Sequence, residues 1–430
     1  MHSLNIITLG CSKNTVDSEV LAAAVAKGDV RVYFETKRKT DAVLINTCGF
    51  IGDAKRESVE TVLHWLQMKE QGQVSFVFVM GCLVERYARE LREEMPAVDG
   101  FFGLNDYNKV FRAMKLSPSS VRDHNRLLST PDHYAYLKIS EGCDRRCSFC
   151  AIPMIRGKHR SRTMKSLMDE AKMLAERGVR ELNLIAQDTT MYGLDLYGKR
   201  ELPRLLDNLA QSGLFEWIRL HYAYPAGFPA GILKLMRDHP SVCRYIDIPL
   251  QHISDPLLKS MKRGLNAVKT RLLLERIRKE VPGVAIRTAF IVGYPGETRA
   301  HFNELLRFVE EQRFDRAGVF TYSPEEGTSA FRLGETVSER TKSSRAAELM
   351  SLQQEISESL NQQKVGQIMK VIIDRKEGEF MIGRTEFDSP EVDQEVLLSP
   401  AGGIKTGTFC QVEITDAGAF DLYGSLVSGV

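Results

Sequence analysis

The chain has 430 residues, which is enough for two or three domains with a substantial core. Hydrophobic residues at 43% and charged residues at 27% are ordinary for a globular protein, and the net charge is only +2. The start of the chain lacks a signal-peptide pattern, and no apolar run approaches the roughly 20 residues needed to cross a bilayer. We therefore expect a cytoplasmic protein without membrane contact, in which clustered cysteines bind metal or carry out redox chemistry.

The first 116 residues alternate short apolar runs with helical patterns. Residues 5–9, 42–46 and 76–80 are β-rich and free of charge, as buried strands are. Residues 16–26, 54–69 and 84–95 have the pattern of the intervening helices. This alternation predicts a doubly wound parallel sheet.

Three cysteines of this first domain follow its predicted strands. Cys11, Cys48 and Cys82 each come directly after one strand, and each has a glycine beside it. The carboxyl ends of parallel strands meet at one edge of the sheet, where such sheets bind ligands. Helix N-termini at the same edge favour a negatively charged, thiolate-bound group. Ordinary packing cysteines are the alternative.

The middle of the chain predicts a second domain over residues 134–362. Residues 117–133 are polar, carry proline near both ends and predict a linker. Six strands then alternate with helices, at 135–140, 181–186, 218–222, 245–248, 285–292 and 317–322. This pattern predicts a partial or complete βα barrel with ligands on the loops after its strands. Residues 338–363 predict a closing helix with Ser338 as its N-cap.

A second group of cysteines follows the first strand of this barrel. Cys143, Cys147 and Cys150 are spaced C-x3-C-x2-C. Iron–sulfur cubanes usually take four cysteines, so three leave one iron open to another ligand. A structural zinc site is the alternative, with His159 as the nearest candidate for a fourth ligand. Three buried packing cysteines are a further alternative.

The last 68 residues, 363–430, have an all-β pattern. Two hairpins are predicted, around residues 377–378 and 417–418, within a small five-stranded barrel. From residue 365 onward, eleven acidic residues oppose five basic ones, a net charge of −6. An RNA-binding domain needs a basic surface to neutralise phosphates. The acidity of this domain instead favours a basic protein partner through charge complementarity. A solvated acidic face is the alternative.

The cysteine loop of the barrel resembles the signature of radical S-adenosylmethionine (SAM) enzymes. In that superfamily the open iron of a 4Fe-4S cluster binds SAM, and an electron from the cluster releases a 5′-deoxyadenosyl radical that abstracts hydrogen. The resemblance implies an electron donor such as a flavodoxin or a ferredoxin. It also implies that Phe149 lies near the adenine.

Together with the first cysteine group, the chain resembles methylthiotransferases over nearly its whole length. The amino-terminal domain of that family is resembled by three segments here: GCSKNTVDSE, NTCGFIGDAKRES and GCLVERY. Proteins of the family end in a TRAM β-barrel. The resemblance implies a second 4Fe-4S cluster on Cys11, Cys48 and Cys82, whose open iron holds sulfur from a separate source. One SAM then serves as methyl donor and a second as the source of the radical.

Within that family, the chain resembles the branch that modifies the β-carbon of an aspartate in ribosomal protein S-twelve of the small subunit. The segments AQDTTMYGLDLYG, YIDIPLQH and FTYSPEEGTSA carry this likeness. Branches that modify adenosine in tRNA usually have Gln-Asn-Val in the first segment and Arg-Pro in the last. A tRNA adenosine methylthiotransferase is the alternative function, and a non-catalytic iron–sulfur carrier or ribosome-assembly factor is a third.

Further residues near the expected mouth of the barrel are candidate contacts of SAM, with the substrate as the alternative ligand of the two glutamines. Gln187 and Gln251 follow the second and fourth strands, and Tyr322 ends the sixth. Arg287, on the fifth strand, is a candidate partner of the SAM carboxylate, with a structural salt bridge as the alternative. Gly293 begins a tight turn that would let the backbone approach the adenosine.

Three acidic residues near the same mouth are candidate substrate contacts. Asp188, Glu325 and Glu326 are predicted to hold a basic substrate loop, with solvated loop positions as the alternative.

Overall fold

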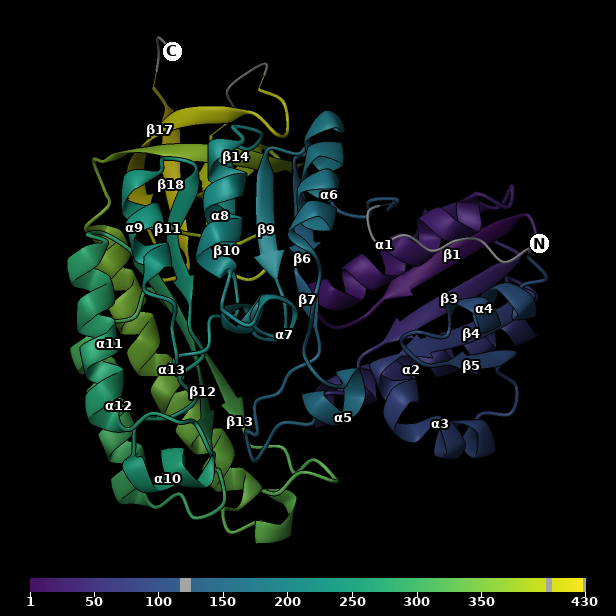
Figure 1. Cartoon of the computed structure of the whole chain (residues 1–430), viewed down its shortest axis with the longest axis horizontal. Coiled ribbons are helices and arrows are strands. Elements are labelled where there is room, and N and C mark those ends of the chain that lie inside the picture. The colour runs from purple at the N-terminus through teal and green to yellow at the C-terminus, as the bar shows by residue number, and fades with distance from the viewer. Residues whose placement is uncertain (117–124, 400–403, 428–430) are drawn as a thin grey trace.

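The computed structural model describes residues 1–116, 125–399 and 404–427. Three units follow one another along the chain: a parallel sheet at the N-terminus, a larger parallel sheet in the middle and a small β-barrel at the C-terminus (Figure 1). In the described part of the chain, no helix has the length and apolar character needed to span a membrane. The predicted α/β fold class is confirmed.

The N-terminal sheet has five parallel strands in the order β2-β1-β3-β4-β5. The strands are β1 (Ser3–Thr8), β2 (Arg31–Phe34), β3 (Ala42–Thr47), β4 (Phe76–Gly81) and β5 (Gly100–Phe102). The helices are α1 (Ser12–Ala26), α2 (Gly52–Glu70), α3 (Cys82–Glu94) and α4 (Tyr107–Ala113). All six residues of β3 are buried, which explains its unbroken apolar run. The chain order reverses between β1 and β3, the place where such sheets bind ligands.

The central sheet has six parallel strands in chain order and stays open. Its strands are β6 (Tyr134–Lys138), β9 (Glu181–Ile185), β10 (Trp217–Leu220), β11 (Val242–Asp247), β12 (Ala285–Val292) and β13 (Arg316–Thr321). The longer helices around it are α6 (Met164–Glu176), α8 (Leu202–Gln211), α9 (Gly231–Asp238), α11 (Ala267–Glu280), α12 (Arg299–Gln312) and α13 (Glu339–Gln362). Since β6 and β13 remain free edges, the barrel is partial.

Helix α8 illustrates how the sequence produces this packing. Leu202, Leu205, Leu206 and Leu209 recur at helical spacing and are all fully buried in the main core cluster. Pro203 lies in the first turn of the helix, where its missing N–H costs no hydrogen bond. Ser338, the predicted N-cap of α13, accepts a hydrogen bond from the backbone N–H of Thr341.

Short elements decorate the loops of the central sheet. They are the strand pair β7 (Ser140–Glu141) and β8 (Arg160–Ser161), the helices α5 (Ile152–Arg156), α7 (Leu194–Tyr197) and α10 (Asp255–Ser260), and the 3-10 turns η1 (Thr189–Met191) and η2 (Phe331–Leu333). Of the predicted linker 117–133, residues 117–124 lie outside the described residues. The remainder is anchored to both flanking units, because buried Arg126 lies 3.6 Å from Glu19 of α1 and 3.3 Å from Glu170 of α6.

The C-terminal unit is a closed five-stranded barrel in the order β14-β15-β16-β18-β17. Its strands are β14 (Ile368–Glu377), β15 (Phe380–Thr385), β16 (Glu395–Leu398), β17 (Phe409–Ala417) and β18 (Asp421–Leu426). Both predicted hairpins are present, with Gly378 at a positive φ of 57° in the first turn. The barrel caps the N-terminal end of the central strands (Figure 1), where Trp217 and Phe409 meet edge to face at 4.8 Å.

Some of the acidic residues of this barrel lie at its contact with the central sheet. Glu386 binds Arg244 at 2.7 Å, Asp388 binds Arg316 at 3.1 Å and Asp393 binds Arg287 at 3.1 Å. In the same loop, Glu391 accepts hydrogen bonds from the hydroxyls of Tyr134 and Tyr136. Four of the eleven acidic residues therefore serve an internal interface, and the basic partner expected from the acidity of the barrel stays a prediction.

A buried charge at this interface leads to a stability prediction. Glu181 is fully buried between Arg219, at 2.9 Å, and Arg384, at 2.7 Å, and these guanidinium groups offset the cost of burial and lower its pKa. Glu181→Gln should leave a buried cation unpaired and lower the free energy of unfolding by about 3–5 kcal/mol. Urea unfolding followed by circular dichroism checks this.

The matched control is Glu216→Gln, since Glu216 is a half-exposed glutamate that binds Lys370 across the same interface. Its replacement should cost less than about 1 kcal/mol. Equal effects of the two substitutions would contradict the assignment of Glu181 as the central charge of the interface.

Candidate functional site

Three cysteines lie at the carboxyl edge of the N-terminal sheet. Cys11 is the N-cap of α1 after β1, Cys48 directly follows β3, and Cys82 is the first residue of α3 after β4. Each therefore sits where a strand passes into a helical segment, close to unpaired backbone N–H groups. We call this group the N-terminal trio.

Glycines beside these cysteines bring the three loops into contact. Gly10 has φ of 93°, and a Cβ there would lie 3.0 Å from the Cys48 sulfur. A Cβ on Gly49 would lie 2.8 Å from the carbonyl carbon of Cys82. Gly81 has φ of 105° and has no room for a side chain between Asn46 and the backbone of Thr47. These glycines therefore allow the three loops to approach one another closely.

Burial opposes the thiolate at two cysteines of the N-terminal trio, whereas nearby cations favour it at the third. Burial raises the pKa of Cys48, and it raises that of Cys82 to about 12. Burial also opposes the thiolate of Cys11, but Lys13 and Arg156 outweigh it and lower the pKa of Cys11. A Cys82 thiolate in this buried place requires a compensating cation or a metal.

The second group of cysteines lies on the loop between β7 and α5, after the first strand of the central sheet. Burial raises the pKa of Cys143 to about 11 and that of Cys150 to about 12. Two donors reach the sulfur atoms: the backbone N–H of Arg145 at 3.4 Å from Cys143, and the Arg263 guanidinium at 3.3 Å from Cys147. We call Cys143, Cys147 and Cys150 the barrel trio.

The donor set fits iron–sulfur clusters better than zinc. Within residues 1–116, 125–399 and 404–427, no three Cys, His, Asp or Glu side chains are arranged to hold a single metal ion. His159, the zinc alternative, is buried beside Ser161, with its ring nitrogen 3.1 Å from the Ser161 hydroxyl. The barrel trio offers three thiols from one loop and the N-terminal trio offers three from adjoining loops, as a cluster requires when every thiolate binds its own iron.

One arginine connects the two trios. Arg156 ends α5, six residues after Cys150, and its side chain is only 4% exposed. Its guanidinium donates to Asp17 of α1 and to Glu141 beside the barrel trio, both at 3.0 Å. It also lies 3.6 Å from the Cys82 sulfur. Sequence reasoning missed Arg156, because its partners are up to 142 positions away.

Phe149 and Tyr322 meet in an apolar cluster at the mouth of the central sheet. Phe149 packs against this cluster, which contains Leu257, Met261, Tyr294, Tyr322 and Ala330. The rings of Tyr294 and Tyr322 meet edge to face at 5.4 Å. The buried Tyr322 hydroxyl has no hydrogen-bond partner among the described residues. The structure thus brings together two of the residues expected near SAM.

Two glutamines lie on the loops after their strands, as expected. Gln187 donates its amide N–H to Glu141 at 2.7 Å, and its buried amide oxygen lacks a partner in the described part of the chain. Gln251 has φ of 73°, a strained value for a residue with a side chain, and pairs through its backbone with β12. Strain of this kind is concentrated at functional sites.

Gly293 and Arg287 have structural partners. A Cβ on Gly293 would lie 2.3 Å from the Lys342 side chain, so its φ of 76° serves the packing of α13. Arg287 is the third residue of β12, at the end of the sheet away from the cysteines. It binds Asp247 and Asp393, each at 3.1 Å. This placement favours the structural salt bridge over a contact with the SAM carboxylate.

The acidic residues expected to hold substrate are mostly engaged within the chain. Asp188 is buried and binds Arg145 of the barrel-trio loop at 2.7 Å. Glu325 is buried and binds Lys55 at 3.0 Å and Arg86 at 2.5 Å, which ties the loop after β13 to α2 and α3. Only Glu326 leaves its carboxylate exposed. The interdomain role of Glu325 gives no signal in the sequence.

The ion pair of Arg86 and Glu325 leads to a second prediction. Both side chains are nearly fully buried, so the cycle of Arg86→Met, Glu325→Gln and the double variant should give a coupling energy of about 1–3 kcal/mol. Thermal unfolding measures the coupling, and hydrogen exchange of residues 323–328 locates it. The exposed pair Arg89–Glu93 on the same helix is the control, with expected coupling below about 0.5 kcal/mol. Equal coupling in both pairs would refute the interdomain role.

Comparison with known proteins gives three matching families. The Radical SAM superfamily matches residues 137–309, the TRAM domain matches 365–427, and the uncharacterized protein family UPF0004 matches 3–103. Among solved structures, the cobalamin-binding radical SAM methyltransferase TsrM from Kitasatospora setae has a TM-score of 0.56 at 14% identity, covering 95% of this chain and 84% of that one. This likeness concerns the fold alone.

Curated relatives are far more similar. Ribosomal protein uS12 methylthiotransferase RimO of Christiangramia forsetii is 53% identical, covering 98% of this chain and 94% of that protein. The protein of the same name from Flavobacterium johnsoniae is also 53% identical, covering 98% of each chain. The matched regions extend over all three units of this chain. The chain therefore belongs to the family of radical SAM ribosomal protein uS12 methylthiotransferases.

Proposed function

We propose that this chain transfers a methylthio group to the β-carbon of an aspartate in ribosomal protein uS12 (S-twelve). The observation that carries the proposal is the pair of three-cysteine sites connected by Arg156. A single three-cysteine site would be enough for radical chemistry. The second site, in a separate unit of the chain, provides a place from which a sulfur atom is delivered.

The six cysteines would hold two 4Fe-4S clusters, one on each trio. When bound, the cluster of the barrel trio and SAM supply a radical that abstracts hydrogen, and the cluster of the N-terminal trio supplies sulfur that a further SAM methylates. The chain positions these groups. Arg145 and Arg263 donate hydrogen bonds to the barrel-trio sulfurs, which stabilises the thiolates. Lys13 and Arg156 compensate the negative charge of the N-terminal trio.

Three side chains are our candidates for holding SAM. Phe149 and Tyr322 form an apolar wall that would exclude water and pack against the adenine. The unpartnered amide oxygen of Gln187 is a free acceptor for an ammonium group, and Glu141 fixes the orientation of this amide. Gln251 would help to shape the same mouth.

The division of labour follows the three units. Residues 1–116 would bind the sulfur-bearing cluster, 134–362 would bind SAM and generate the radical, and 363–430 would brace the central sheet. Exposed Glu326 remains the candidate for a contact with a basic loop of the substrate. In the cytoplasm, a flavodoxin or a ferredoxin would supply electrons, and a separate sulfur source would reload the cluster.

A deletion strain tests the proposal. Mass spectrometry of the uS12 peptide that contains the target aspartate should show the methylthio group in the parent strain and its absence after deletion. Complementation with the wild-type chain should restore it. If the peptide stayed modified and a methylthio nucleoside vanished from tRNA, the chain would be a tRNA enzyme. If neither changed, the reading as an iron–sulfur carrier or assembly factor would gain support.

A further inference from the structure

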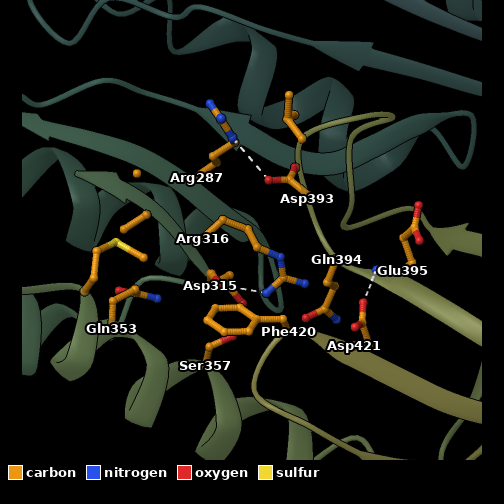
Figure 2. A pocket seen from close by; sticks show the side chains of 14 residues that line it. Arg287, Asp315, Arg316, Gln353, Ser357, Asp393, Gln394, Glu395, Phe420 and Asp421 are labelled. Atoms are coloured by element: carbon orange, nitrogen blue, oxygen red, sulfur yellow. Dashed lines mark hydrogen bonds and ion pairs between the residues drawn. The ribbon is translucent and has the colours of Figure 1, made fainter. Parts of the chain in front are cut away.

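A cavity of about 370 Å³ lies between the central sheet and the C-terminal barrel, remote from both cysteine trios. Its walls come from β13, α13, the loop before β16 and the turn before β18 (Figure 2). The proposed reaction makes no use of it. Figure 2 shows the ring of Phe420 lying among the side chains of Asp315, Ser357 and Gln394.

The two cations of this cavity are already neutralised. Arg287 binds Asp247 and Asp393, and Arg316 binds Asp388 and the backbone oxygen of Asp315. A phosphate or carboxylate entering the cavity would have to displace these buried carboxylates. The cavity therefore disfavours anions.

The polar atoms that remain are mainly hydrogen-bond acceptors. Gln353 is 4% exposed and donates its N–H to Phe314, which leaves its amide oxygen without a partner in the described chain. Gln394 is 5% exposed, and neither its amide oxygen nor its nitrogen has a described partner. Asp315 and Asp421 each accept only one backbone N–H from the described residues. A buried acceptor without a donor costs free energy that a ligand can recover.

An exposed aromatic ring and an unpaired strand edge complete the cavity. Phe420 is 53% exposed and presents a ring face on which a planar cation can stack. Ala317 and Gly318 of β13 also line the cavity, and β13 is an edge strand of the central sheet. An edge strand offers backbone groups to an extended polypeptide.

We propose that this cavity binds the guanidinium group of an arginine side chain presented by a basic polypeptide. A guanidinium is planar, always charged and carries only donors, which matches separated acceptors beside an aromatic ring. An ammonium group is compact and uses such a spread of acceptors less well. The proposal does not depend on the proposed reaction, because the cavity lies at the opposite end of the central sheet from the cysteines.

The test measures peptide binding to the full chain by isothermal titration calorimetry and ligand-observed NMR. The probe is acetyl-Gly-Arg-Gly-amide, and its partner carries citrulline, which keeps the shape and removes the charge. We expect the arginine peptide to bind at least about tenfold more tightly than the citrulline peptide, because its hydrogen bonds are charge-assisted. It should also bind more tightly than free arginine, which lacks the flanking backbone.

Variants of the two glutamines link this binding to the cavity. Gln394→Leu should weaken binding about tenfold and leave the melting temperature unchanged or higher, since it removes a buried amide without a partner in the described chain. Gln353→Leu should also weaken binding about tenfold, but it should lower the melting temperature slightly, because the Phe314 carbonyl loses its donor. Gln363→Leu, at the exposed end of α13, is the control and should change nothing.

Several outcomes would overturn the proposal. They are no binding of the arginine peptide, equal binding of the citrulline peptide, or unchanged binding in folded Gln394→Leu. Preferential binding of a short oligouridylate, lost in Gln394→Leu, would assign the cavity to RNA instead.

Discussion

Cys82→Ala is expected to abolish methylthio transfer while SAM cleavage continues. Cys82 belongs to the N-terminal trio, whereas the radical chemistry depends on the barrel trio. After anaerobic reconstitution, the variant should lose about half of its iron, since one of two clusters is lost. It should still release 5′-deoxyadenosine from SAM. Chromatography of the nucleoside and mass spectrometry of the peptide product check both expectations.

Two matched variants make this prediction specific. Cys147→Ala should lose both SAM cleavage and transfer, because Cys147 belongs to the barrel trio. Cys410→Ala should lose neither, since this cysteine lies in the C-terminal barrel with its sulfur directed at the Val371 carbonyl. If Cys82→Ala stopped SAM cleavage as completely as Cys147→Ala, the assignment of separate roles to the two trios would be wrong.

Arg156→Met should have the second large effect. The substitution removes one of the two cations that join Asp17 to Glu141, so that Lys138 alone remains between them, and it removes the donor beside the Cys82 sulfur. Breaking a buried charge network of this kind costs about 3–5 kcal/mol, which is enough to displace one trio from the other. We expect at least a hundredfold loss of product, since about 2.7 kcal/mol already accounts for that factor.

The effect of Arg156 on the N-terminal cluster can also be measured spectroscopically, without an assay of enzyme activity. The electron paramagnetic resonance signal and the reduction potential of that cluster should change in Arg156→Met. Arg156→Lys should restore them only in part, because an ammonium group cannot span the same partners. Arg160→Met, at an exposed position on the same segment, is the control and should match the wild type. An unchanged signal and product in Arg156→Met would remove its positioning role.

The pattern of strands and the places of the cysteines followed from the sequence for physical reasons. The buried strands β3 and β4 stand out because they are free of charge, and the central strands stand out because their short apolar runs alternate with helical patterns. Once those strands are set, a residue after each strand must lie at the carboxyl edge, which brings Cys11, Cys48 and Cys82 together. The short strands β2 and β5 escaped prediction, because strands of four and three residues carry too little pattern.

The roles of the charged residues did not follow from the sequence. Arg287 and Glu325 have the residue types of a binding site, but their partners Asp393 and Arg86 come from other units of the chain. Four acidic residues of the C-terminal barrel likewise bind partners in the central sheet. A charge in a sequence shows neither its partner nor its burial, so structural and functional ion pairs look alike until the units are docked.

The central claim is that both clusters act together on one substrate, and a single reaction tests it. The reconstituted full chain is incubated anaerobically with a reductant, sulfide, SAM and the uS12 peptide that contains the target aspartate. The product peptide should gain one methylthio group in place of one hydrogen at the aspartate, together with release of 5′-deoxyadenosine. Release of 5′-deoxyadenosine with an unmodified uS12 peptide, from protein shown to hold both clusters, would contradict the account.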